Sequence, residues 1–386
     1  MDDYDHTSSS PLSSIGAIGP EALHKIVLRQ IQMLWKRPEQ TSLVPPLMVW
    51  GPPGVGKSTI LREAAQELGI GFVDVRLAQR EPVDVRGLPV PNREKGAVEW
   101  LVASDWPREG RGILLFDELT AADRTLQVAA YELILDRRLG DLYRLPPGWY
   151  VCAAGNRIED AAVATGMSSA LANRFLHVEL APNAEQWTRW AIRQGIHRNV
   201  LGFLRFRPDL LFQMSNENLE RGWPSPRAWE RVGLLEEEFE ETPDDPLFEP
   251  LVRGLVGAGV AIEYMDYRKA ASEFGDVRAL LLDPTIPLAI PDKADRRYAF
   301  CAAVAYSVWR AADEEEQTRL LDGFYRVSAA LPGSYASMLM TDAMAGPDGK
   351  GDPKWAERLT LHPGFAAWRK TFGTLHSLLG TARSEP

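Results

Sequence analysis

The chain has 386 residues, 45% hydrophobic and 25% charged, which is the ordinary balance of a globular protein with room for about two or three domains. Its 53 Asp and Glu against 43 Lys and Arg give a formal net charge of −10, which disfavours a general nucleic-acid-coating protein because such proteins are normally basic. No apolar stretch approaches the ~20 residues of a membrane span, and the acidic N-terminus is unlike a secretory signal, so we expect a cytoplasmic protein with no membrane span.

The first part of the chain is predicted to alternate strands with helices. Residues 1–19 are rich in Ser and Gly and are expected to form a flexible leader, and a helix follows because Leu23, Val27 and Ile31 recur at helical spacing. From residue 47 onward short apolar runs alternate with helical patterns, and these runs are residues 47–50, 71–77, 113–116, 150–154 and 176–180. Strands buried on both faces read as continuous apolar runs, so residues 20–182 are predicted to form an α/β domain with a parallel sheet.

After residue 182 the strand-like runs largely disappear. Asn183 and Gln186 have the spacing of a capping box, and helical patterns continue from there. We predict a helical segment over residues 183–285 and a C-terminal helical extension with a tail over residues 286–386. The acidic residues between 236 and 241 are expected to be a solvated helix face.

The strongest motif has the form GxxxxGK[ST], and it lies between the apolar run 47–50 and an amphipathic helical pattern. Its glycines allow backbone N–H groups to face phosphates at a helix N-terminus, Lys57 is expected to pair with phosphate oxygens, and the Ser58 hydroxyl is expected to bind Mg²⁺. The predicted nucleotide-binding residues are Gly51, Pro52, Pro53, Gly54, Val55, Gly56, Lys57, Ser58 and Thr59.

Two carboxylates, Asp117 and Glu118, follow the apolar run 113–116. Successive residues of a strand point to opposite faces, so the two side chains can take different tasks. Asp117 is expected to hold Mg²⁺ together with Ser58, and Glu118 to act as the general base on the attacking water. Together with the glycine-rich motif, this pair predicts a P-loop nucleotidase.

The residues that follow indicate which branch of P-loop proteins this is. One apolar run ends at Gly155-Asn156-Arg157, and Asn173-Arg174-Phe175 precedes another. Here the chain resembles the AAA+ ATPases, and within them the MoxR-like group, which is related to the magnesium-chelatase ATPase subunit and to the rubisco-activating CbbQ proteins. The resemblance extends over about residues 22–284 and implies an AAA+ core followed by a helical lid.

The resemblance also implies three further catalytic residues. Asn156 is similar to sensor 1, which orients the attacking water, and Arg174 is similar to the arginine finger that reaches a nucleotide bound by the neighbouring subunit. Arg227 follows a favourable N-cap, Ser225, so it lies in a first helical turn where a cation is disfavoured unless an anion is nearby. It resembles sensor 2 of the lid.

By the same resemblance we expect a hexameric ring that uses ATP and Mg²⁺ to remodel a partner protein, commonly one with a von Willebrand factor A domain. Residues 80–101 are similar to an insert that faces the pore of such rings, and residues 138–145 are similar to the hairpin that precedes sensor 1. Leu88, Trp100 and Tyr143 are candidates for touching a substrate there, although core packing is the default for each. A nucleic-acid-stimulated ring motor and an ATP-gated scaffold with little turnover are the alternatives; the acidic charge counts against the first, and Glu118 and Arg174 against the second.

Overall fold

The computed structural model describes residues 16–94, 96–157, 167, 169–214, 222–272, 276–346 and 353–381. The chain divides into two compact units, Met1–Pro182 and Asn183–Pro386. Most of the predicted leader, residues 1–15, lies outside the described residues. Of its remainder, Ile18 forms a parallel bridge with Leu180 and donates its N–H to the Glu179 carbonyl at 2.8 Å. Within the described ranges, no helix is long and apolar enough to cross a bilayer.

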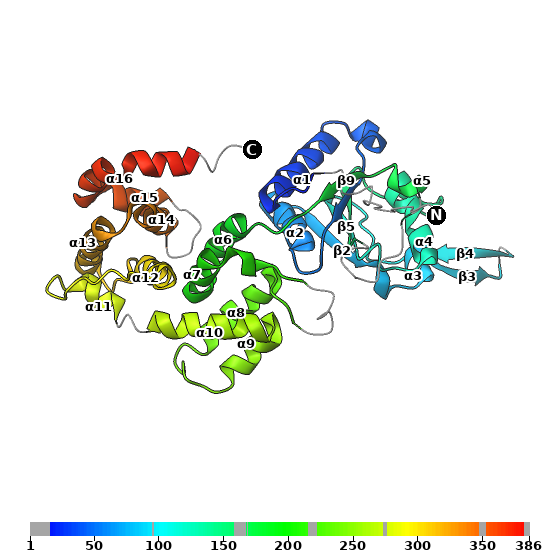
Figure 1. Ribbon diagram of the computed structural model, residues 1–386. Helices are drawn as coiled ribbons and strands as arrows, with labels where there is room; N and C mark the ends of the chain where they lie inside the picture. Colours follow the sequence, from blue (N-terminus) through cyan, green and yellow to red (C-terminus); the bar gives the residue numbers. More distant parts are fainter. Residues whose placement is uncertain are drawn as a thin grey trace, which may run out of the picture. The chain divides into compact units, whose positions relative to one another are not determined.

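The centre of the first unit is a five-stranded parallel sheet with the strand order β2-β5-β8-β1-β9 (Figure 1). Its strands are β1 (Leu47–Trp50), β2 (Gly71–Arg76), β5 (Arg111–Asp117), β8 (Gly148–Gly155) and β9 (Leu176–Glu179). Every pairing is parallel and each strand overlaps one of the apolar runs, so the predicted parallel sheet is confirmed. The central strands β1 and β8 are buried almost throughout, which is why their sequences read as unbroken apolar runs.

Helices cover both faces of this sheet. Helices α1 and α2 pack against each other on one face, and α4 packs on the other (Figure 1). Met48 of β1 and Phe116 of β5 share a core with Leu133 of α4. The helices and single turns of this unit are α1 (Pro20–Trp35), η2 (Pro38–Leu43), α2 (Lys57–Glu67), η3 (Leu77–Gln79), α3 (Pro82–Arg86), α4 (Arg124–Asp136) and α5 (Ser169–Ala172).

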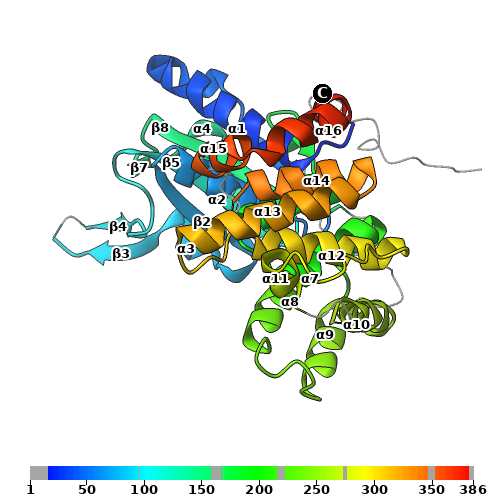
Figure 2. The same cartoon turned by 90° about the vertical axis from the view of Figure 1, so that its left-hand side faces the viewer.

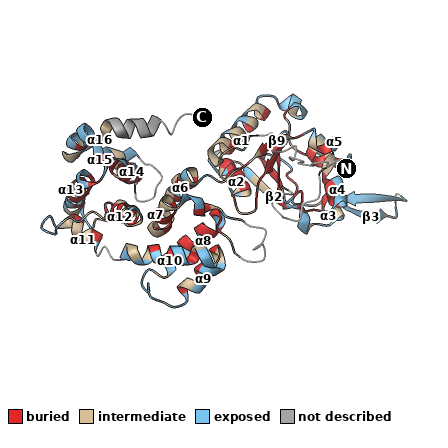
Figure 3. Cartoon of the chain, viewed as in Figure 1, coloured by how far each residue is buried: buried red, intermediate tan, exposed pale blue. Residues whose placement is uncertain are grey.

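Two small antiparallel hairpins accompany the sheet, β3 (Leu88–Asn92) with β4 (Ala97–Leu101) and β6 (Arg138–Leu139) with β7 (Tyr143–Arg144). The β3–β4 hairpin extends away from the α/β core, as Figure 2 shows, and all five residues of β4 are exposed (Figure 3). Core packing is the prediction for Leu88, Trp100 and Tyr143. It is wrong for Leu88 and Trp100, which are 54% and 43% exposed. It is right for Tyr143, which is buried and donates its hydroxyl to the Pro107 carbonyl at 2.6 Å.

The regular secondary structure of the second unit consists, in its described residues, of helices alone. Its helices are α6 (Ala184–Arg193), α7 (Arg198–Phe206), η5 (Pro208–Leu211), α8 (Pro226–Glu238), α9 (Phe248–Val256), α10 (Ala258–Ser272), α11 (Val277–Leu282), α12 (Ala294–Ser307), α13 (Glu314–Ala330), α14 (Gly333–Met344), α15 (Pro353–Leu361) and α16 (Gly364–Thr381). One core gathers around Trp229 and Phe203, and another around Phe324 and Leu339. Helix α12 packs against both α7 and α14 and so joins the two cores.

The prediction that the acidic residues between 236 and 241 form a solvated helix face is wrong for Glu236. Glu236 is only 2% exposed, and its carboxylate accepts hydrogen bonds from the Tyr264 hydroxyl at 2.6 Å and from Arg268 Nε at 3.1 Å. The reason is helical spacing: Trp229, Val232 and Glu236 follow one another along the buried side of α8, whereas the next two glutamates turn toward solvent.

Candidate nucleotide-binding site

The loop between β1 and α2 has the backbone that a phosphate cradle requires. The φ angles of Gly51, Gly54 and Gly56 are 153°, 82° and 98°, a region that residues with a Cβ rarely adopt. Helix α2 begins immediately after Gly56, so the unpaired N–H groups of its first turn face this loop. The structure places the predicted residues Gly51, Pro52, Pro53, Gly54, Val55, Gly56, Lys57, Ser58 and Thr59 in this loop and in the first turn of α2.

Lys57 is buried at the base of this cradle. Its ammonium donates hydrogen bonds to the carbonyl oxygens of Gly51 at 2.5 Å and Pro52 at 3.1 Å, and to Asn156 Oδ1 at 2.9 Å. Because β1 and β8 are neighbours in register, with Trp50 opposite Gly155, the loop after β1 and the residue after β8 meet at one edge of the sheet. The ammonium therefore lies between the predicted cradle and the predicted sensor.

Ser58 and Asp117 are in direct contact. The Ser58 hydroxyl donates to Asp117 Oδ2 at 2.6 Å, while Oδ1 of the same carboxylate accepts the Glu118 backbone N–H at 2.9 Å. A hydroxyl beside a carboxylate at the end of a strand is an oxygen ligand pair of the kind that Mg²⁺ takes. The two predicted metal ligands thus come together, although they are 59 positions apart in the chain.

Glu118 lies just beyond the end of β5, and its backbone is strained. Its φ of 56° is in the left-handed region, which among the described non-glycine residues is shared only with Arg137. Such a conformation costs about 1–3 kcal/mol and is concentrated at functional sites. The strand has ended before Glu118, so this left-handed turn, rather than the alternation of a strand, gives Glu118 a direction different from that of Asp117. Its carboxylate is exposed.

Asn156 directly follows β8, and its backbone is held by a residue that the sequence analysis did not predict. Its N–H donates to Thr120 Oγ1 at 3.1 Å, and the Thr120 hydroxyl donates to the Asn156 carbonyl at 3.3 Å. The one sequence signal for Thr120 is its position three residues after Asp117. Arg157, to which no role was given, forms an ion pair with Glu179 of β9.

Arg174 is exposed in the turn between α5 and β9, and none of the described carboxylates forms an ion pair with it. The segment just before it is anchored to β1 through a histidine. The Trp50 indole N–H donates to His177 Nδ1 at 2.9 Å, and His177 Nε2 lies 2.7 Å from the Ala172 carbonyl oxygen, so this ring carries its proton on Nε2. Neither Trp50 nor His177 was predicted from the sequence.

Arg227 lies in the second unit, exposed in the first turn of α8. Ser225 caps this helix, and its hydroxyl accepts the Ala228 N–H at 3.2 Å, as the sequence predicted. A guanidinium at this end of a helix opposes the positive end of the helix dipole, and none of the described carboxylates forms an ion pair with it. The structure therefore presents Arg227 to solvent within its own unit.

One carboxylate near the site has a perturbed pKa. Burial of Asp74 on β2 raises the pKa of its carboxyl, the negative charge of Asp117 raises it further, and the Arg62 guanidinium 3.2 Å away lowers it. The negative charge of Asp117 therefore reaches Asp74 on the neighbouring strand, since β2 and β5 are paired in the sheet.

These groups fit a nucleoside triphosphate with Mg²⁺. A buried ammonium and the N-terminus of α2 suit phosphate oxygens, and the contact between Ser58 and Asp117 suits the metal. Elsewhere in the part of the chain that the structure describes, no three His, Cys, Asp or Glu side chains gather as a separate metal site.

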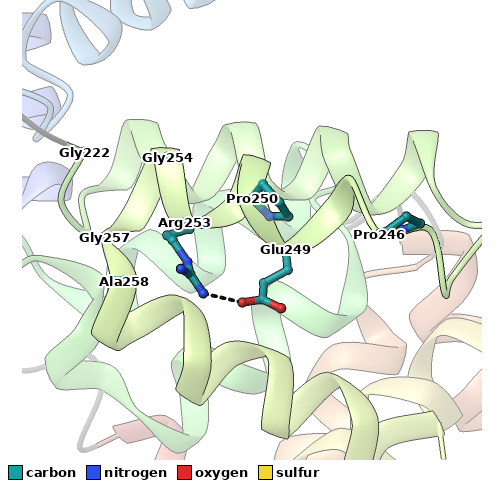
Figure 4. Close-up of a pocket in the computed structure, with 8 residues that line it drawn as sticks. All are labelled: Gly222, Pro246, Glu249, Pro250, Arg253, Gly254, Gly257 and Ala258. Carbon is teal, nitrogen blue, oxygen red and sulfur yellow. Dashed lines mark hydrogen bonds and ion pairs between the residues drawn. The ribbon is translucent and has the colours of Figure 1, made fainter.

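The second unit contains a pocket of about 670 Å³ that is lined mainly by α9 and by the turn into α10 (Figure 4). Among the residues that line this pocket, Arg253 and Glu249 form the only ion pair, at 2.5 Å. The remaining lining residues are Gly222, Pro246, Pro250, Gly254, Gly257 and Ala258. This lining has neither a cluster of cations for phosphate nor a nucleophile, so the chemistry points to the edge of the sheet instead.

The fold and this site define a P-loop nucleotide-binding domain with an AAA+ core, followed by a largely helical region. Residues 47–160 match the family described as "ATPase family associated with various cellular activities (AAA)", so this part of the chain is an AAA ATPase-family domain. The match spans the cradle, Asp117, Glu118 and Asn156, but not Arg174 or Arg227. A search of curated proteins gives no match.

Among solved structures, the Thermotoga maritima RuvB Holliday junction branch migration motor is similar over 88% of this chain and 87% of its own, with 14% identity and a TM-score of 0.35. A putative ATPase from Cytophaga hutchinsonii is similar over 88% and 87%, with 13% identity and a TM-score of 0.29. NtrX from Brucella abortus is similar over 88% and 67%, with 16% identity and a TM-score of 0.28. Similarity this weak tells nothing about what this chain binds.

Proposed function

We propose that this protein is a MoxR-like AAA+ ATPase that hydrolyses ATP to ADP and phosphate and uses the reaction to remodel or activate a partner protein. The observation that carries the proposal is the cluster at the sheet edge, in which Lys57 contacts Asn156, Ser58 contacts Asp117, and Glu118 is held in a strained, exposed position. A scaffold that only binds nucleotide has no need for the last of these.

Each group has a role that its surroundings support. Lys57 and the N–H groups of α2 would hold the triphosphate, and Ser58 with Asp117 would hold Mg²⁺, which supplies positive charge against the phosphate oxygens when bound. Asn156 would orient a water molecule with its amide. Glu118, whose side chain is exposed, would take the proton of that water as it attacks.

Arg174 is proposed to act on the nucleotide of a neighbouring subunit. Its guanidinium is exposed and pairs with no carboxylate among the described residues, as a group that acts in trans requires. An arginine in this role stabilises charge on the transferred phosphoryl group, and its loss costs about 10³–10⁵ in rate. This proposal implies a ring, which we take to be hexameric by resemblance. By the same resemblance, Arg227 of the lid is proposed as a further contact with the phosphate.

The exposed β3–β4 hairpin is the proposed contact with the partner protein. Its apolar side chains, including Leu88 and Trp100, remain in solvent in the isolated chain, and such exposure is typical of a surface that another protein covers. A von Willebrand factor A domain protein is the partner class that the resemblance suggests. The net charge of −10 does not favour nucleic acid in this place.

The proposal is tested by measuring ATP turnover and nucleotide binding for the wild type and three variants. Lys57→Ala is expected to lose both, whereas Glu118→Gln and Arg174→Ala are expected to bind nucleotide and lose turnover. Arg29→Ala, which removes an exposed arginine of α1, is the matched control and should retain full activity. Equal turnover in the wild type and Lys57→Ala would refute the proposal.

Sharing of the site between subunits has its own test. Glu118→Gln and Arg174→Ala are each expected to be inactive alone, but a mixture should regain part of the turnover. In mixed rings the intact Arg174 of one subunit faces the intact Glu118 of its neighbour. A mixture as inactive as its components would show that Arg174 does not act in trans.

A further inference from the structure

Thr120 is a buried polar residue that lies two positions after the proposed general base. It is 2% exposed and belongs to the turn that connects β5 with α4. Its hydroxyl both accepts from and donates to the backbone of Asn156, at 3.1 and 3.3 Å. One side chain thus satisfies the N–H and the carbonyl of the same residue, as a neighbouring strand would.

The end of β8 is shaped to admit this side chain. A Cβ on Gly155 would lie 2.8 Å from Thr120 Oγ1, Thr120 Cγ2 and Met48 Cε, closer than such atoms approach one another, so glycine leaves the space that these two side chains fill. Leu119 extends the contact, since its N–H donates to the Ala154 carbonyl at 2.9 Å. Residues 119 and 120 therefore dock along the last residues of β8.

This docking couples the two residues that are proposed to handle the attacking water. The strained turn at Glu118 is closed by its own carbonyl, which accepts the N–H of Ala121 at 2.9 Å, and Thr120 lies within that turn. On the other side, Thr120 holds the backbone of Asn156, whose Oδ1 lies 2.9 Å from Lys57 Nζ. No other described side chain bonds to both polar backbone groups of Asn156 in this way.

We propose that Thr120 is a positioning residue of the ATPase site, which sets the position of Asn156 relative to Glu118 through its hydroxyl. This inference rests on the proposed function. It does not make Thr120 a catalytic residue, because its hydroxyl is already engaged with the Asn156 backbone and faces protein on every side.

The central test compares two substitutions of similar size. Thr120→Val removes the hydroxyl and is expected to lower kcat about 10- to 100-fold, because a misplaced catalytic group costs rate even when binding is intact. The dissociation constant for nucleotide should change less than about threefold, since Lys57 and Ser58 are untouched. Thr120→Ser keeps the hydroxyl and should retain kcat within about threefold.

A double-mutant cycle separates positioning from a general structural role. If Thr120 acts through Asn156, then Asn156→Ala and the double variant Thr120→Val with Asn156→Ala should have the same kcat. An additional loss in the double variant, or wild-type kcat for Thr120→Val, would overturn the inference. Thermal unfolding confirms that each variant is folded at the assay temperature.

A second variant keeps the test decisive if Thr120→Val does not fold. Gly155→Ala keeps the Thr120 hydroxyl but pushes it away from Asn156, so it should lower kcat more than it weakens nucleotide binding. Unchanged kcat in the folded variant would contradict the inference. The comparison of wild type with Lys57→Ala decides the proposed function beforehand. A wild type no more active than Lys57→Ala refutes both proposals, whereas an active wild type leaves the Thr120 variants to test positioning alone.

Discussion

Replacing Glu236 by alanine should destabilise the helical unit far more than the same substitution one residue later. The Glu236 carboxylate is buried between α7, α8 and α10 and accepts hydrogen bonds from the Tyr264 hydroxyl, from Arg268 Nε and, at 3.2 Å, from the Asn199 amide. Glu237 is exposed on the same helix, so Glu237→Ala controls for helix propensity and for loss of one negative charge.

The magnitude follows from what the substitution leaves behind. Removing one member of a buried ion pair costs about 3–5 kcal/mol, because the other charge remains without its partner. Arg268 keeps two other contacts, a hydrogen bond to the Pro243 carbonyl at 2.6 Å and a position 4.2 Å above the Phe248 ring, which reduces the cost. The Tyr264 hydroxyl, wholly buried, loses its acceptor and adds about 1–3 kcal/mol. We therefore expect a loss of about 3–5 kcal/mol.

Urea unfolding of the full chain, followed by far-ultraviolet circular dichroism, measures this loss as a shift in midpoint at unchanged slope. Glu237→Ala should stay within about 0.5 kcal/mol of the wild type. Glu236→Gln, which keeps the volume and an acceptor for Tyr264 but loses the charge, should lie between the two. Equal midpoints for Glu236→Ala and Glu237→Ala would refute the assignment of Glu236 as the anchor of this network.

Three further outcomes are expected from the same unfolding measurement. Burial and the charges of the neighbouring arginines lower the pKa of His197 from 6.5 to about 3. Between these two pH values the histidine is protonated in the unfolded chain and neutral in the folded chain. The contribution of His197 to stability is then largest above pH 6.5 and falls toward pH 3, by about 2 kcal/mol at pH 5, and His197→Asn, which can still cap α7, should remove this part of the decline. Asp342→Ala leaves Arg205 buried without its ion-pair partner and should cost about 3–5 kcal/mol, whereas Glu249→Ala, in an exposed pair, should cost less than about 1 kcal/mol. Trp100→Ala should change stability by less than about 0.5 kcal/mol, because the side chain is exposed; a larger loss would show that the hairpin is packed.

The parallel sheet was predictable because its central strands, β1, β5 and β8, are buried almost throughout. The apolar run at residues 47–50 coincides with β1, and the run at residues 113–116 lies within β5. The glycine-rich loop was equally predictable, since three glycines at this spacing adopt positive φ angles that other residues avoid. These features depend on neighbouring residues, so one stretch of sequence contains the information that specifies them.

The exposed hairpin and the buried glutamate were not predictable in this way. The sequence of β4 has the apolar content of a core strand, but among the described residues of its unit no helix or sheet packs over it, so Trp100 lies in solvent. Glu236 belongs to a run of glutamates that reads as a solvated surface. Its burial depends on α10 bringing Tyr264 and Arg268 to the same place.

From its residues alone, this chain could be assigned an α/β nucleotide-binding domain, a phosphate cradle and an acidic pair, because each depends on spacing within a few turns or one strand. The tertiary structure alone decided which polar groups meet. Thr120 bonds to Asn156 across 36 positions, and Lys57 to the same residue across 99, because the strand order places β5, β8 and β1 side by side. Strand order is set by the packing of the whole sheet, and no local pattern in the sequence encodes it.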